Sequence, residues 1–182
     1  MSRILLVQVG AVALLAAAVT AGCGGSDSSG TTTEAAATTT TATAERLTSA
    51  QWAEYETSRA ALRSANTAAN ATLKKCSDTT QFQDTTALQT CVGDTFSALT
   101  VAAGDSLNTL KSFESSVTGS CATALANLSN YVGTFQASAA EMQRAVDSPT
   151  MAGYPAASEN LQQALTAGKA EAQTFEQECA PA

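Results

Sequence analysis

The sequence predicts an all-α fold, an antiparallel up-down-up-down four-helix bundle closed by two disulfides. Four long segments carry apolar residues at alternating spacings of three and four, the period of one helix face, and none alternates with the strand period of two. Short breaks between the segments return the chain on itself, and four cysteines lie near segment ends. These observations favour an antiparallel bundle over a long parallel coiled coil.

The first two predicted helices cover about residues 49–75 and 84–114. Thr48 or Ser49 can cap the first helix, because a side-chain oxygen there accepts a hydrogen bond from an early backbone amide. The apolar pattern of the second region continues along its whole length and predicts a single helix.

The third helix has the most regular pattern, and the fourth covers about residues 155–178. Ser120 is a suitable N-cap for the third helix, and Pro149 follows its end at Asp147. The series with spacings of four and three is Cys121, Leu125, Leu128, Val132, Phe135, Ala139, Met142 and Val146.

The cysteine positions agree with this topology. In an up-and-down bundle the end of the first helix meets the start of the second, and the start of the third meets the end of the fourth. We therefore expect the disulfides Cys76–Cys91 and Cys121–Cys179, since other pairings would join cysteines roughly 40 Å apart. A redox or metal-binding role is the alternative, but the chain has no Cys-x-x-Cys and no histidine.

Residues 1–22 have the pattern of a secretory signal peptide: Arg3 is followed by a mostly apolar run over 4–19 and then by small residues. The ending Ala21-Gly22-Cys23 resembles a bacterial lipobox. The resemblance implies that Cys23 is lipidated, becomes the mature N-terminus and anchors the chain in the membrane. The alternative is an ordinary cleaved signal peptide that leaves Cys23 as a spare thiol.

A low-complexity segment separates this signal from the bundle. Residues 24–45 contain no large apolar side chain and consist mainly of Gly, Ser, Thr and Ala, so they cannot bury enough surface to offset the entropy of ordering. We expect residues 23–45 to be a lipidated, disordered tether and residues 46–182 to be the bundle domain.

Composition excludes several classes of function. The net charge of −7, without a Lys/Arg cluster, argues against a nucleic-acid partner. Without histidine the chain cannot build a Ser-His-Asp, Cys-His or histidine-containing di-iron site, and no Gly-rich phosphate loop is present. We expect no enzyme activity, no catalytic residue, no cofactor and no metal site.

Five residues are candidates for a binding role. Arg59 and Asn66 stand on the apolar seam of the first helix, where they either fix helix register or line a small ligand pocket. Phe82, Met151 and Tyr154 lie in the two connections expected at the membrane-distal end. They either mark a contact surface or close the open end of the core.

The sequence thus predicts a lipid-anchored protein on the extracytoplasmic face of a bacterial cell membrane. We expect a non-enzymatic interaction or structural module with a protein partner in the envelope. The alternative is a small-ligand-binding protein that uses the bundle interior or the membrane-distal loops. A pocket of several hundred cubic ångströms between the helices would favour that alternative.

Overall fold

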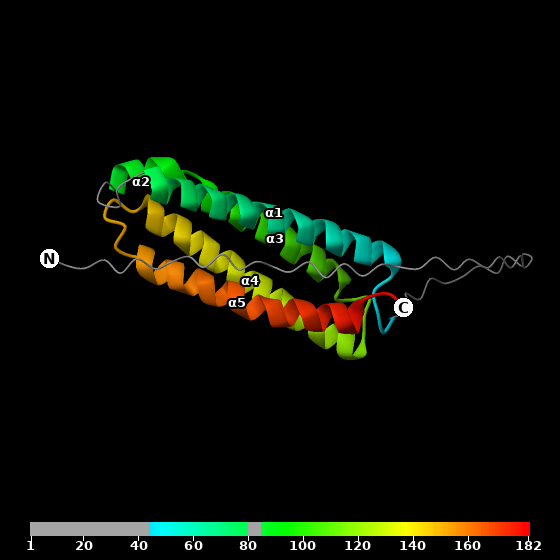
Figure 1. The fold of residues 1–182 in the computed structure, drawn as a ribbon. Helices are drawn as coiled ribbons and strands as arrows, with labels where there is room; N and C mark the ends of the chain where they lie inside the picture. Colours follow the sequence, from blue (N-terminus) through cyan, green and yellow to red (C-terminus); the bar gives the residue numbers. More distant parts are fainter. Residues whose placement is uncertain (1–43, 80–84) are drawn as a thin grey trace, which may run out of the picture. The chain divides into compact units, whose positions relative to one another are not determined.

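The structure, a computed structural model, describes residues 44–79 and 85–182. These residues form a helical bundle, as predicted (Figure 1). Its helices are α1 (Ser49–Thr79), α2 (Thr85–Val92), α3 (Thr95–Phe113), α4 (Gly119–Asp147) and α5 (Tyr154–Cys179). Consecutive arms of the bundle run antiparallel, and α2 and α3 together make the second arm.

The prediction of one continuous second helix is wrong. The chain leaves helical geometry at Gly93 and Asp94, where Gly93 has a φ of 49°, a left-handed conformation that glycine adopts without steric penalty. Thr95 Oγ1 donates a hydrogen bond to the Val92 carbonyl across this break, at 2.5 Å. The second arm therefore consists of two helices joined by a two-residue turn.

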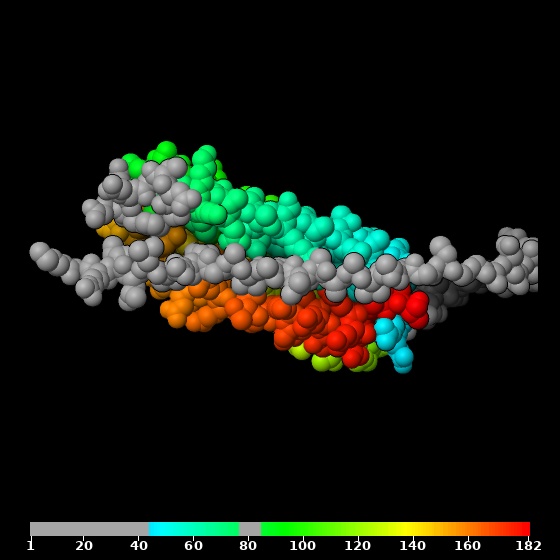
Figure 2. All heavy atoms as spheres, in the orientation of Figure 1, coloured from blue at the N-terminus to red at the C-terminus, as the bar shows by residue number. Residues whose placement is uncertain are grey.

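The helices pack in chain order around the bundle. α1 lies against α3, α3 against α4 and α4 against α5, while the short α2 contacts α1 and, less extensively, α4. α1 and α5 lie on the face shown in Figure 2, and Tyr55 and Trp52 of α1 contact Phe175 of α5. α1 therefore packs more extensively on α3, and α5 on α4, than α1 and α5 pack on each other.

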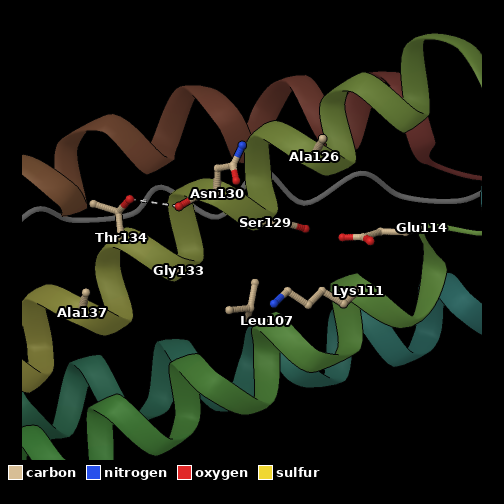
Figure 3. Close-up of a pocket in the computed structure, with 9 residues that line it drawn as sticks. All are labelled: Leu107, Lys111, Glu114, Ala126, Ser129, Asn130, Gly133, Thr134 and Ala137. Carbon is tan, nitrogen blue, oxygen red and sulfur yellow. Dashed lines mark hydrogen bonds between the residues drawn. The ribbon is translucent and has the colours of Figure 1, made fainter.

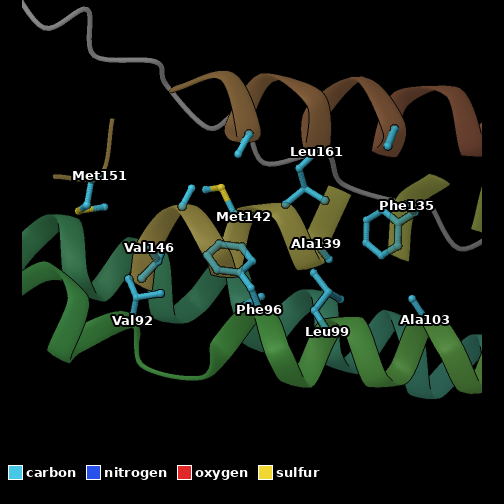
Figure 4. Close-up of a cluster of buried hydrophobic side chains, with 14 of the residues drawn as sticks. Val92, Phe96, Leu99, Ala103, Phe135, Ala139, Met142, Val146, Met151 and Leu161 are labelled. Carbon is cyan, nitrogen blue, oxygen red and sulfur yellow. The ribbon is translucent and has the colours of Figure 1, made fainter. Parts of the chain in front are cut away.

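The apolar core consists of two clusters stacked along the bundle. One cluster, which we call the distal cluster, lies toward the end of the bundle opposite the C-terminus and is drawn in part in Figure 4. It contains Phe96, Leu99, Phe135, Met142 and Leu161 among others. The terminal cluster, at the end that holds the C-terminus, contains Leu47, Tyr55, Phe113, Leu125 and Phe175 among others. Tyr131 of α4 packs against both clusters, so one aromatic side chain connects the two halves of the core.

The first described residues are fastened to the terminal end of the bundle. The Ala44 amide donates to the Ser116 carbonyl at 3.0 Å, and the Thr118 amide donates to the Ala44 carbonyl at 2.9 Å. Leu47 is buried in the terminal cluster, and its amide donates to the Cys179 carbonyl. Contacts with the bundle are therefore already made by Ala44, the first described residue, and these residues lie beside the C-terminus of the chain.

Candidate functional site

Both predicted disulfides are confirmed. Cys76 at the end of α1 is bonded to Cys91 in α2, with 5.7 Å between the Cα atoms. Cys121 at the start of α4 is bonded to Cys179 at the end of α5, with 4.8 Å between the Cα atoms. Each bond joins neighbouring helices at one end of the bundle, so the four cysteines act as structural cross-links.

Arg59 reaches across from α1 to α5, and it lines neither of the two grooves described below. Its guanidinium forms an ion pair with the Glu176 carboxylate and lies 5.8 Å from the centre of the Tyr55 ring. Both charged side chains are half-buried, which makes the pair a register contact between the two helices. Asn66, the second candidate on this seam, is also half-buried.

An aromatic cluster surrounds this ion pair. The ring centres of Tyr55 and Phe175 are 4.8 Å apart in an edge-to-face arrangement, and Trp52 stacks on Phe175 at 6.2 Å. Burial raises the pKa of Tyr55 to about 12. The cluster holds α1 to α5 at the terminal end, although these two helices pack less extensively on each other than α1 packs on α3 or α5 on α4.

Met151 and Tyr154 close the distal end of the core. Met151 is 8% exposed and belongs to the distal cluster, and Tyr154 packs against that cluster. Met151 has a φ of 49°, and its Ser148–Met151 turn is followed by the start of α5. Burial leaves Met151 little surface for a partner, which favours the core-closing role. Phe82 lies outside the described residues.

Two glutamines that the sequence pattern did not single out fasten the α2–α3 break to the end of α4. Gln143 Oε1 accepts hydrogen bonds from the amides of Phe96 and Ser97 at 3.1 and 3.0 Å, and thus caps the start of α3. Its Nε2 donates to the Gly93 carbonyl and to Asp147 Oδ1. Both the oxygen and the nitrogen of the Gln143 side-chain amide therefore have hydrogen-bond partners.

Gln89 of α2 makes the complementary contact. Its Nε2 donates to the carbonyl oxygens of Val146 and Ser148 at 2.6 and 2.8 Å, and so satisfies acceptors at the end of α4. The two glutamines come from different arms of the bundle, and each bonds the backbone at the other's helix end. A sequence pattern of apolar residues carries no signal for such a contact.

Two grooves lie on the outside of the bundle. One, of about 480 Å³, runs between α3 and α4 (Figure 3). The other, of about 530 Å³, lies along α5 beside Gln162 and Thr166. The first groove is lined by Leu107, Lys111, Glu114, Ala126, Ser129, Asn130, Gly133, Thr134 and Ala137. The space between the helices is occupied by large buried side chains, namely Phe96, Phe113, Phe135 and Phe175.

Within the described ranges, no three or more Cys, Asp or Glu side chains are grouped so that they could hold a metal ion. Among the helices of these ranges, none combines the length and apolarity needed to cross a membrane. Cys23 and the signal segment 1–22 lie outside the described residues. No protein-family model, curated protein or solved structure matches this chain.

Proposed function

We propose that this protein is a lipid-anchored component of the bacterial cell envelope, held on the extracytoplasmic face of the membrane through Cys23. Its bundle acts as a non-enzymatic interaction or structural module. The observation that carries the proposal is the use of the five cysteines. Four are consumed by Cys76–Cys91 and Cys121–Cys179, and the fifth, Cys23, ends the lipobox-like segment.

The two disulfides also support the compartment. Stable structural disulfides form in oxidising surroundings, which in bacteria means outside the cytoplasm. A signal peptide followed by a lipidated cysteine would deliver the chain to such a compartment and retain it at the membrane. Lipid-processing at Cys23 therefore explains both the localisation and the odd number of cysteines.

The fold suits a module that is anchored at one end and holds its opposite end away from the membrane. Residues 44–47 are bonded to the terminal end of the bundle, so a membrane anchor upstream of them would hold that end nearest the lipid. Residues 24–43, which separate Cys23 from this end of the bundle in the sequence, lie outside the described residues. The α2 end of the bundle, which includes the described connection between α4 and α5, then points away from the membrane.

The filled interior favours an interaction module over a protein that carries a small ligand within the bundle. Phe96 and Phe135 occupy the space between α3 and α4 in the distal half, and Phe113 and Phe175 lie in the terminal cluster. Both described grooves are on outer faces. A partner would therefore bind on the outside of the helices.

Metabolic labelling with an alkyne fatty acid, followed by intact-mass measurement and detergent-phase partition, tests the anchor. We expect the wild-type chain to carry diacylglycerol at a mature N-terminal Cys23 and to partition into detergent. Cys23→Ala should abolish labelling and leave residues 1–22 attached, whereas the control Ser26→Ala should behave as wild type. A mature N-terminus at another residue, with a free thiol at Cys23, would contradict the proposal.

A further inference from the structure

The two disulfides differ in how far they are shielded from solvent. Cys121 and Cys179 are both fully buried in the terminal cluster. In the other bond Cys76 is fully buried, but Cys91 is half-buried and packs against the distal cluster. A thiolate can exchange only with a disulfide sulfur that it can reach, so Cys91 is the cysteine of these four that an incoming thiol approaches most readily.

The helix that carries Cys91 is the shortest one in the described part of the chain. α2 has eight residues, and a helix of this length does not persist in water by itself, because its few hydrogen bonds do not offset the cost of nucleation. Its position therefore depends on contacts with the other helices. Besides the bond to Cys76, these include the burial of Leu88 and Val92 in the distal cluster and the hydrogen bonds from Gln89 to the end of α4.

The break at Gly93 and Asp94 lets α2 move without α3. Gln143 holds the α3 side of the break, because its side-chain amide bonds the amides of Phe96 and Ser97 and the Gly93 carbonyl. None of these three bonds involves a residue of α2. Glycine at position 93 can also change its backbone angles without steric penalty, so the chain can bend there while α3 keeps its start.

We propose that Cys76–Cys91 is a redox-sensitive latch for α2 that a dithiol reductant opens. One thiolate of the dithiol attacks Sγ of Cys91 and forms a mixed disulfide, while the bond to Cys76 breaks and the Cys76 thiolate takes up a proton. The second thiolate of the dithiol then attacks the mixed disulfide and releases Cys91 as a thiol. The dithiol leaves as a disulfide, and its two electrons and two protons end on Cys76 and Cys91.

Opening this latch releases one helix and leaves the rest of the bundle joined. Val92 of α2 and Val146 of α4 belong to the same cluster and lie side by side in Figure 4, and Gln89 bonds the Val146 carbonyl. Movement of α2 therefore uncovers the end of α4. The buried Cys121–Cys179 bond still holds α4 to α5 at the terminal end. The compartment in which a dithiol meets the chain rests on the proposed function, whereas the exchange itself depends only on the fold.

Reduction of the mature chain in mild detergent by dithiothreitol, a small dithiol, tests the latch. Samples are alkylated at increasing times, and peptide mass spectrometry gives the reduced fraction of each cysteine. We expect Cys76 and Cys91 to be reduced at least tenfold faster than Cys121 and Cys179. Brief treatment with glutathione, a monothiol, should place the mixed disulfide on Cys91. Equal rates, faster reduction of Cys121–Cys179 or a mixed disulfide on Cys76 would overturn the proposal.

Hydrogen exchange shows whether α2 moves by itself. After reduction of Cys76–Cys91, the amides of residues 86–92 should exchange at least tenfold faster, while those of Phe96 and Leu128 keep their rates. A Cys76→Ser/Cys91→Ser chain should show the same pattern without reductant. The matched control, Cys121→Ser/Cys179→Ser, should accelerate residues 86–92 no more than it accelerates α4. Equal acceleration of all helices on loss of Cys76–Cys91 would contradict a latch that acts on α2 alone.

These measurements do not depend on the membrane anchor. Cys23→Ala chains should show the same order of reduction and the same exchange pattern. Failure of the lipid anchor and failure of the latch therefore give different results.

Discussion

Gly168 lies in the middle of α5, directly beneath the ring of Tyr131 on α4. A Cβ atom at Gly168 would overlap that ring, so the absence of a side chain is what allows the tyrosine to fit between the two helices. Glycine inside a helix costs about 1 kcal/mol relative to alanine. Here that cost is offset by the packing of Tyr131, which connects the two clusters of the core.

We predict that Gly168→Ala lowers the free energy of unfolding by about 1–3 kcal/mol, because the new methyl group forces the Tyr131 ring out of its place. In a Tyr131→Ala background the same change should raise it by up to about 1 kcal/mol, since only helix propensity then remains. Urea unfolding of the four chains measures both values. The same sign in both backgrounds would show that Tyr131 does not explain the glycine.

Tyr55 makes stability depend on pH in the alkaline range. Burial raises its pKa from 10.0 to about 12, so the folded state holds the phenolic proton more tightly than the unfolded state. The stabilisation of the folded state by this pKa difference is fully present below pH 10 and is lost as pH rises from 10 to 12. A shift of this size corresponds to about 3 kcal/mol.

We therefore expect the free energy of unfolding to fall between pH 10 and 12, and to fall less steeply for Tyr55→Phe. Burial also raises the pKa of Tyr131 to about 12, so the variant should keep part of the pH dependence. Rapid urea unfolding at pH 9, 10 and 11 provides the measurement, with phenolate absorbance as a check on ionisation. An equal slope for both chains would contradict the assignment to Tyr55.

At the scale of helices, the start of α3 is capped by a side chain from another arm. Asp94 precedes α3 but makes no capping hydrogen bond, and Gln143 of α4 accepts from the Phe96 and Ser97 amides instead. The turn at Gly93 is therefore stabilised by a residue 50 positions away. Together with Gln89, this contact fixes α2 and α3 against the end of α4.

We predict that Gln143→Ala lowers the free energy of unfolding by about 2–4 kcal/mol, because it leaves two helix amides without a partner and opens a small cavity. Gln173→Ala on the exposed side of α5 is the control, with an expected change within about 0.5 kcal/mol. Hydrogen exchange should accelerate at Phe96 and Ser97 more than at Leu128. Uniform acceleration at all three would argue against a local cap.

The positions of the four arms could be predicted because each arm repeats its apolar residues with the helical period. The break between α2 and α3 could not, because the same spacing continues across it: Leu88, Val92, Phe96 and Leu99 are all buried. One glycine within a helical pattern is a weak signal. What decides the break is the hydrogen bonding supplied by Gln143, and a local pattern does not contain that information.

At the scale of the whole molecule, the helix topology could be predicted from the cysteine positions, whereas the surface grooves could not be predicted from the sequence. Cysteines at helix ends restrict which helices can be neighbours, so both disulfides were predictable. The groove between α3 and α4 depends on how far each helix is rotated about its axis, which the apolar stripe defines only loosely. The candidate residues Arg59 and Met151 make contacts within the bundle. The sequence could not decide this, because a polar residue on a helix seam or an apolar residue in a loop can serve either internal packing or binding.

We predict that loss of Cys121–Cys179 destabilises the bundle more than loss of Cys76–Cys91. The first bond spans 58 residues and the second 15, and loop-closure entropy gives about 4 and about 3 kcal/mol respectively. Urea unfolding of the two double-alanine variants checks the ranking. The reverse order would mean that α2, and not the terminal end, limits stability.

The fastening of residues 44–47 also determines how the molecule would respond to mechanical load. A pull on the chain upstream of Ala44 first stretches its bonds to Ser116 and Thr118, and then the contact between Arg46 and the Ala180 carbonyl. Releasing residues 44–48 would give about 17 Å of slack before the force reaches α1. Because Cys121–Cys179 covalently joins α4 to α5 at this end, those two helices would stay together while residues 44–48 detach under load. The segment could then bind again at the same place when the load is removed.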